Sequence, residues 1–202
     1  MALKIRSILL TALFFFSISA AAYDSNPYAA ASAVYKIEIQ DHDVVHMGTG
    51  VLISRNKILT NCHVVRQNGV FRVIHQQTGQ VFSPTSYYNL GNYDACILQG
   101  NFTQGTPVAL SGQFEIGENV WHFGYPRNIF AFGQGVILRL VNTNQGLVIE
   151  SGSFCNPGSS GSPLFNVKGE LIGLNFGVRS QGSQDKCLSI PIANLLPFLQ
   201  NN

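Results

Sequence analysis

The sequence predicts an all-β fold built from barrels. Many short runs of β-branched or alternating apolar residues follow one another, with Gly, Asn and Pro between them, and such runs fit strands better than helices. A helix-like apolar period occurs only near the C-terminal end. The chain has 202 residues, 46% of them hydrophobic, so it can bury one sizeable core but hardly two. We therefore expect one folded domain.

Eight runs predict strands, in chain order Val34–Ile39, Gly50–Ile53, Val70–Ile74, Ala95–Leu98, Asn119–Phe123, Gly135–Val141, Leu147–Glu150 and Glu170–Phe176. A further strand is expected to end at Thr60. Residues 83–92 (SPTSYYNLGN) are the weakest part of the pattern and predict a loop. The run Ile190–Leu199 predicts a short C-terminal helix, with Pro191 just ahead of its first turn.

The first 22 residues have the features of a secretory signal peptide. Lys4 and Arg6 precede a nearly unbroken apolar run, Ile8–Ile18, and small residues follow it up to Ala22. The run is shorter than the roughly 20 apolar residues of a membrane span, although a retained membrane anchor is the alternative. We therefore expect a folded domain over residues 23–202 that is secreted or periplasmic.

The composition excludes several classes of partner. Only 11% of the residues are charged and the net charge is +2, which leaves no basic face for nucleic acid. The four cysteines form no CxxC pair, and no His or Cys lies at zinc-finger spacing from another. The sequence therefore predicts no nucleic-acid partner, no metal and no cofactor.

Three short stretches carry candidate catalytic residues. His63 follows a strand in ILTNCHVV, Asp94 opens an apolar strand in NYDACIL, and Ser160 lies in CNPGSSGSPLF. Alone, each has an ordinary explanation as a solvated histidine, a turn aspartate or part of a hairpin turn. Together they supply the groups of nucleophilic catalysis. A serine hydroxyl becomes a good nucleophile when an imidazole takes its proton, and a buried carboxylate holds that imidazole in the right tautomer.

These stretches resemble a known family. GTGVLISRNKILTNCHVV, YDACIL and NPGSSGSPLF are similar to the three signature blocks of chymotrypsin-fold, or trypsin-like, serine proteases. The NPGSSGSP form is closest to the bacterial branch with HtrA-like and glutamyl-endopeptidase-like enzymes. The resemblance covers nearly all of the chain after residue 22. It implies two six-stranded antiparallel β-barrels with the active site between them, a short C-terminal helix, and no PDZ module after residue 200.

The resemblance also assigns catalytic roles. His63 is the implied general base, Asp94 its orienting carboxylate, and Ser160 the nucleophile, because Ser160 occupies the serine position of the family pattern Gly-X-Ser-Gly-X-Pro. The backbone N–H groups of Gly158 and Ser160 are the implied oxyanion hole. Ser159 stands where the pancreatic enzymes carry an Asp that pairs with a freed amino terminus. Activation by insertion of a new N-terminus is therefore not expected.

Five substrate-binding residues are implied by the same resemblance, namely Phe154, Asn156, Asn175, Phe176 and Gly177. The segment Asn175–Gly177 is similar to the edge strand that pairs with the substrate backbone, although an ordinary core strand is the alternative. No Asp lies at the pocket floor around Ser153, and no His lies near Asn175, so neither a basic nor a glutamate P1 side chain is expected. We expect a small or medium apolar P1 side chain.

The four cysteines are expected to form two disulfides, because export permits them. Cys62 precedes His63 and Cys96 lies two residues after Asp94, so a hydrogen bond between the base and the carboxylate brings these cysteines into one neighbourhood. The bridge Cys155–Cys187 is implied by the resemblance, since a family bridge ties the walls of the specificity pocket together. The expected pairs are Cys62–Cys96 and Cys155–Cys187, with four buried free thiols as the alternative.

The sequence as a whole therefore predicts a serine endopeptidase that works through an acyl-enzyme intermediate. We expect protein or peptide substrates, a monomer, and no membrane contact once the signal peptide is removed. One alternative is a catalytically idle barrel used for binding, against which the complete set of catalytic residues argues. The other is an esterase with the same triad, which a strand pattern without βα alternation disfavours.

Overall fold

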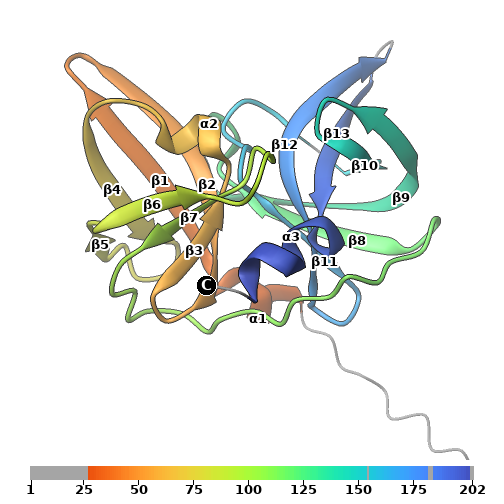
Figure 1. Ribbon diagram of the computed structural model, residues 1–202, viewed down its shortest axis with the longest axis horizontal. Helices are drawn as coiled ribbons and strands as arrows, with labels where there is room; N and C mark the ends of the chain where they lie inside the picture. Colours follow the sequence, from red (N-terminus) through yellow and green to blue (C-terminus); the bar gives the residue numbers. More distant parts are fainter. Residues whose placement is uncertain (1–26, 154, 182–183, 201–202) are drawn as a thin grey trace, which may run out of the picture.

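The computed structural model describes residues 27–153, 155–181 and 184–200, shown in Figure 1. The N-terminal half contains α1 (Pro27–Ala31), β1 (Val34–Asp41), β2 (Val44–Ser54), β3 (Lys57–Thr60), α2 (Cys62–Val65), β4 (Val70–His75), β5 (Val81–Phe82), β6 (Ser86–Asn89) and β7 (Cys96–Gln99). The C-terminal half contains β8 (Asn119–Gly124), a 3₁₀ turn (Pro126–Asn128), β9 (Ala131–Thr143), β10 (Gly146–Ser151), β11 (Pro163–Asn166), β12 (Leu171–Gln181), β13 (Gln184–Pro191) and α3 (Ile192–Leu199).

The strands form two antiparallel sheets, one from each half of the chain. The first has seven strands in the order β5-β4-β1-β2-β3-β7-β6, and the second is a closed barrel in the order β10-β13-β12-β11-β8-β9. The first sheet is curled, because Phe71 on β4 stacks on Tyr87 on β6 near the opposite edge, with ring centroids 6.4 Å apart. The chymotrypsin-like fold is confirmed, although a curled seven-stranded sheet takes the place of the first expected six-stranded barrel.

Alternating apolar residues place the core inside each sheet. On β1, Tyr35, Ile37 and Ile39 are completely buried, while the residues between them are partly exposed. One large cluster of buried side chains begins in the first sheet and continues under α3. The closed barrel has its own smaller cluster, consisting of Val120, Ile137, Ile149, Leu164 and Ile172. Both sheets are therefore held rigidly on either side of the space between them.

Two local predictions were wrong, because strand pairing overrides weak local patterns. Part of the expected loop over residues 83–92 is β6, which pairs with β7. Residues 184–191, where no strand was expected, form β13, which pairs along β12, so the run Ile190–Leu199 is divided between the end of this strand and the helix from Ile192. Pro191 is the N-cap of that helix, as expected.

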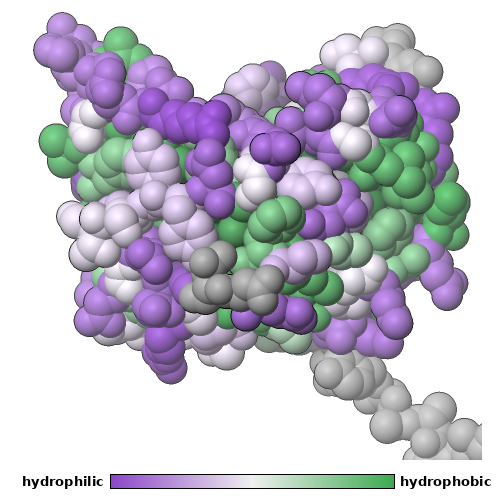
Figure 2. Space-filling model, in the orientation of Figure 1, coloured by the Kyte–Doolittle hydropathy of each residue, from purple (hydrophilic) through white to green (hydrophobic). Residues whose placement is uncertain are grey.

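The molecular surface is hollowed where the two halves meet. Figure 2 shows a notch at the top of the molecule between the two lobes, and Figure 1 places α2 at this notch. Exposed apolar residues gather on the outer side of β9 and β10, where Phe132, Val136, Leu138 and Leu147 face the solvent. Within residues 27–200, excluding 154, 182 and 183, no helix is long and apolar enough to cross a bilayer.

Candidate active site

His63 lies on the one-turn helix α2, which follows β3 directly. The helix begins at Cys62, and its N-cap residue Asn61 is completely buried. The Asn61 side chain donates a hydrogen bond from Nδ2 to the carbonyl oxygen of Asp94, at 2.6 Å. Because Asn61 and Asp94 come from segments 33 residues apart, this bond joins the start of α2 to the start of β7.

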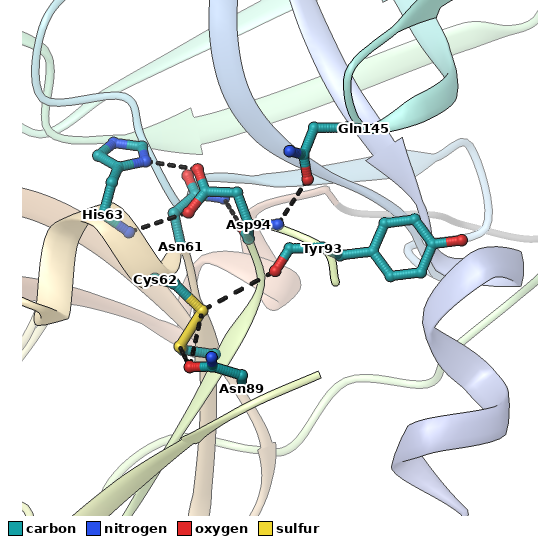
Figure 3. The surroundings of a disulfide bond; sticks show 8 residues. Asn61, Cys62, His63, Asn89, Tyr93, Asp94 and Gln145 are labelled. Carbon is teal, nitrogen blue, oxygen red and sulfur yellow. Dashed lines mark hydrogen bonds and ion pairs between the residues drawn. A yellow bond between two sulfur atoms is a disulfide. The ribbon is translucent and has the colours of Figure 1, made fainter. Parts of the chain in front are cut away.

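The Asp94 carboxylate is bound twice by His63 (Figure 3). The backbone N–H of His63 donates to Oδ1 at 2.9 Å, and Nδ1 of the ring lies 2.5 Å from Oδ2. A carboxylate only accepts hydrogen bonds, so Nδ1 of His63 carries a proton in this contact, and Nε2 is the ring nitrogen that remains available to act as a base. The His63 side chain is 48% exposed and that of Asp94 only 21%. The structure therefore directs Nδ1 of a partly exposed imidazole at a half-buried carboxylate.

The pKa of Asp94 is lowered from its ordinary value. Burial is the largest single influence and opposes ionisation, but the hydrogen bonds and the charge of His63, together with the backbone of Cys62, outweigh it. The Asp94 backbone is fixed as well, because its N–H donates to Oε1 of Gln145 at 2.5 Å. Gln145 comes from the β9–β10 hairpin of the closed barrel, so His63 from the first half holds the carboxylate of Asp94 and Gln145 from the second half holds its backbone (Figure 3).

This lowered pKa predicts a loss of stability in acid. A carboxyl group whose folded-state pKa is depressed binds more protons when unfolded, so its contribution is complete above the unfolded pKa of about 3.9 and is lost as the pH falls through the folded pKa. Urea unfolding at a series of pH values should therefore show the wild type losing its advantage over Asp94→Asn between about pH 5 and pH 2. A difference that stays constant over this range would contradict the prediction.

The disulfide Cys62–Cys96 lies directly beneath this pair of residues. Both sulfur-bearing residues are completely buried, and their Cα atoms are 4.8 Å apart. One cysteine precedes His63 in α2, and the other begins β7 two residues after Asp94. The bridge therefore ties together the two segments that carry the base and the carboxylate, and the expected pairing is confirmed.

The loop before β11 presents Ser160 on a turn that requires glycine at two positions. Gly158 and Gly161 have φ values of 97° and 82°, in the left-handed region. A Cβ at Gly158 would lie 2.3 Å from the carbonyl oxygen of Tyr125, and one at Gly161 would lie 2.0 Å from that of Thr49. Side chains are excluded at both positions, so the turn packs tightly against β2 and the end of β8.

Burial distinguishes the three serines of this turn. Ser159 and Ser162 are buried, at 3% and 0% exposure, whereas Ser160 is partly exposed. Ser159 Oγ accepts a hydrogen bond from the backbone N–H of Asn156 at 3.3 Å. Of the three serines, only Ser160 is accessible enough to meet a substrate.

Ser160 and α2 both lie next to Gly48 in β2. A Cβ at Gly48 would be 2.6 Å from the Val64 side chain and 3.3 Å from the carbonyl oxygen of Ser160. Within the part of the chain that the structure describes, Ser160 Oγ forms no hydrogen bond with His63 Nε2. In enzymes without substrate such bonds are often long and tighten when substrate binds. The structure thus pairs His63 with Asp94 by hydrogen bonds and places both α2 and Ser160 next to Gly48.

The expected pocket residues lie around the second disulfide, Cys155–Cys187, whose pairing is also confirmed. Ser153 is buried, and its hydroxyl is 2.8 Å from that of Ser151, so the pocket floor carries no charge there. Asn156 is partly buried. Phe154 lies outside the described residues.

The segment Asn175–Gly177 of β12 is open at Gly177 and buried at Asn175. A Cβ at Gly177 would have no atom within 4 Å, so a peptide has room to approach there. Phe176 beside it is partly exposed, and the register of β12 against β13 shifts across these residues. Asn175 is 1% exposed, and its Nδ2 donates to the Ser159 carbonyl at 2.9 Å. Asn175 therefore binds the turn that carries Ser160.

Among the described residues, one group of possible metal ligands lies close enough together to hold an ion. It consists of His122, Cys155 and Cys187, whose ligand atoms lie within 4.8 Å of one another. Both sulfurs are bonded to each other in the disulfide, and a disulfide sulfur is not the thiolate that a metal ion prefers. These residues do not fit a metal ion in this state.

Three residues that contact the site were not singled out in the sequence. Thr49 lies inside the GTGVLIS stretch, Asn61 precedes α2, and Gln145 occupies the tip of a hairpin. All three have common polar side chains without a spacing that marks them. Only the pairing of distant strands places them beside the catalytic candidates.

Comparison with known proteins gives one family. Residues 48–174, more than half of the chain, match the model of the trypsin-like peptidase domain. The active form of the Rv3671c protease from M. tuberculosis is similar over 98% of this chain and 93% of its own, with 19% identity and a TM-score of 0.76.

Two further solved structures share the fold over part of their length. The HtrA-type protease AlgW with a tripeptide matches 89% of this chain with 22% identity and a TM-score of 0.76. The serine endoprotease from Yersinia pestis also matches 89%, with 24% identity and a TM-score of 0.74. This chain covers 63% and 66% of those two chains, respectively, which is less than two thirds of their length.

Proposed function

This chain belongs to the trypsin-like peptidase family, and from that membership we propose that it is a serine endopeptidase with Ser160 as nucleophile, His63 as general base and Asp94 as the orienting carboxylate. The observation that carries the proposal is the His63–Asp94 pair, in which Nδ1 binds the carboxylate and Nε2 remains available to act as a base. Ser160 supports the proposal as well, because it is the one serine of the glycine turn that is partly exposed.

The proposed reaction has two halves. His63 Nε2 takes the proton from Ser160 Oγ as that oxygen attacks the carbonyl carbon of the peptide bond, and the resulting imidazolium gives the proton to the departing amine. Water then attacks the acyl-enzyme by the same route, releasing the second product and restoring the serine. Asp94 stabilises the imidazolium in both halves, and its lowered pKa keeps it ionised at neutral pH.

The negative oxygen of each tetrahedral intermediate needs donors that are already in place. The N–H groups of Gly158 and Ser160 form no hydrogen bond within the described part of the chain, so we assign them this role. Preorganised donors of this kind are worth about 3 kcal/mol of transition-state stabilisation each.

We further propose that substrate backbone pairs with β12 at Gly177 and that the P1 side chain is small or medium and apolar. Support comes from the open space at Gly177. The neutral hydroxyl pair Ser151–Ser153 would leave a charged P1 side chain without a counter-charge at the pocket floor.

The test is direct. A fluorophosphonate probe should label the wild-type protein covalently, and a peptide library should be cleaved after apolar residues, with activity falling as the pH is lowered from about 8 to about 5 because the base must be neutral. Absence of both labelling and cleavage would contradict the proposal and favour the alternative of a catalytically idle binding protein. Labelling with hydrolysis of esters but no peptides would indicate an esterase.

We also propose that the protein is exported after removal of residues 1–22. The charged start and the apolar run of the sequence support this, as do the two disulfides, which persist in oxidising compartments. Mass analysis of the protein recovered from periplasm or culture medium should show a first residue between Ala21 and Tyr23. An intact Met1 would contradict this proposal.

A further inference from the structure

Thr49 on β2 connects the first sheet to the nucleophile turn. The residue is completely buried. Its backbone N–H donates to the carbonyl oxygen of Ser160 at 2.8 Å, and its hydroxyl Oγ1 donates to that of Gly158 at 3.1 Å. The same hydroxyl accepts from the N–H of Tyr125, also at 3.1 Å. One side chain therefore contacts β2, the end of β8 and the turn that carries Ser160.

Thr49 binds the carbonyl oxygens of two peptide groups in this turn, which are separated by one other peptide group. In the Gly158–Ser159 peptide, the carbonyl oxygen is bound by the Thr49 hydroxyl, and the N–H donates to the carbonyl oxygen of Asn156. In the Ser160–Gly161 peptide, the carbonyl oxygen is bound by the Thr49 N–H, and the N–H donates to the protein as well. Both groups are bound at both ends, so neither can rotate without losing two hydrogen bonds.

The two peptides that alternate with them, Pro157–Gly158 and Ser159–Ser160, are bound only through their carbonyl oxygens within the described part of the chain. The Pro157 carbonyl accepts from the N–H of Arg127 at 2.8 Å, and the Ser159 carbonyl accepts from the Asn175 side chain and from the N–H of Ser162. In a trans peptide the C=O and N–H point in opposite directions. A carbonyl held inside the protein therefore directs the N–H of the next residue, Gly158 or Ser160, outward.

We propose that Thr49 is a positioning residue that fixes the oxyanion hole of this enzyme from the first sheet. The assignment rests on the proposed function. Thr49 holds the two fully bonded peptides, and their orientation sets that of the neighbouring N–H donors. The hole is thereby organised without an ion pair at Ser159, whose side chain is uncharged.

The chemistry of the Thr49 side chain suits this task because a hydroxyl both accepts and donates. A methyl group in its place would leave the Tyr125 N–H and the Gly158 carbonyl without this partner inside the protein. Buried backbone groups without partners are costly, so the turn would relax toward whatever orientation satisfies them. The expected cost appears in the transition state, where the donors act, more than in substrate binding.

The test compares Thr49→Ser with Thr49→Ala, which differ from each other only by the hydroxyl, and adds Thr49→Val as a variant of similar volume. Active sites are counted with a fluorophosphonate, and kcat and KM are measured on one peptide substrate together with the affinity for its aldehyde analogue. Thr49→Ala and Thr49→Val should lower kcat about tenfold or more and weaken aldehyde binding by a similar factor, with KM changed less than about twofold. Thr49→Ser should recover most of the loss.

Tyr35→Phe is the matched control, because it removes another buried hydroxyl, bonded to the carbonyl oxygen of Gln104, in the first sheet. It should leave kcat unchanged. The assignment is overturned if Thr49→Ala matches Thr49→Ser in kcat and aldehyde affinity, or if Tyr35→Phe shows the same loss. A wild type that neither reacts with the probe nor cleaves peptide would overturn the proposed function and this assignment together.

Discussion

The Ser160→Ala variant is expected to lose peptide hydrolysis and fluorophosphonate labelling while keeping its fold. The change deletes one partly exposed hydroxyl from a turn held by backbone bonds, so the free energy of unfolding should change by less than about 1 kcal/mol. Loss of a nucleophilic serine lowers kcat by roughly 10⁴- to 10⁶-fold in enzymes of this mechanism. Fluorophosphonate labelling and peptide hydrolysis measure the loss of activity, and circular dichroism checks that the fold is kept.

Two neighbouring serines provide the controls for that result. Ser159→Ala and Ser162→Ala each remove a buried hydroxyl from the same turn, and both variants should still be labelled at Ser160. Full labelling of Ser160→Ala would refute the assignment of the nucleophile. Loss of labelling only in Ser159→Ala would transfer that role to Ser159.

The double variant Cys62→Ala/Cys96→Ala should lose both stability and catalysis. The bridge spans 34 residues, so the chain-entropy model gives a loss of about 4 kcal/mol in the free energy of unfolding. The bridge also joins the residue before His63 to the strand after Asp94. Without it the two side chains keep their hydrogen bonds but lose the covalent tie that fixes their backbones, and kcat should fall even where the protein is fully folded.

The second bridge offers a matched comparison, because Cys155 and Cys187 are separated by 32 residues. Cys155→Ala/Cys187→Ala should cost a similar free energy but disturb the pocket, and hence KM, rather than the base. Urea unfolding and steady-state kinetics at a temperature where both variants are folded separate the two effects. Equal changes in kcat and KM for the two double variants would show that the first bridge has no particular role in the His63–Asp94 geometry.

Much of this architecture could be predicted because the signals are local. The apolar alternation of β1 and the β-branched run of β9 identify strands without any knowledge of their partners. Gly158 and Gly161 belong to the short stretch NPGSSGSPLF, and both have a positive φ, a conformation that glycine favours. The candidate site could be predicted because its signals are also local. His63, Asp94 and Ser160 each lie in a short stretch with its own flanking pattern, and they occur in the family's order.

The remaining features depend on contacts between distant segments. β13 could not be separated from the helix after it, because its identity comes from pairing with β12. β6 likewise exists through its partner β7. The hydrogen bond from the Asn175 amide to the Ser159 carbonyl also joins segments that only the closure of the barrel brings together.

The complete burial of Cys62 and Cys96 has a kinetic consequence. Thiol–disulfide exchange requires a thiolate to reach one sulfur, so its rate depends on access as well as on driving force. A reductant in solution cannot reach either sulfur of this bridge until the segment around α2 and the start of β7 opens. The half-life of the bridge in a reducing buffer should therefore report how often that segment opens. The lifetime of the protein in a reducing environment is thereby linked to local unfolding beside His63.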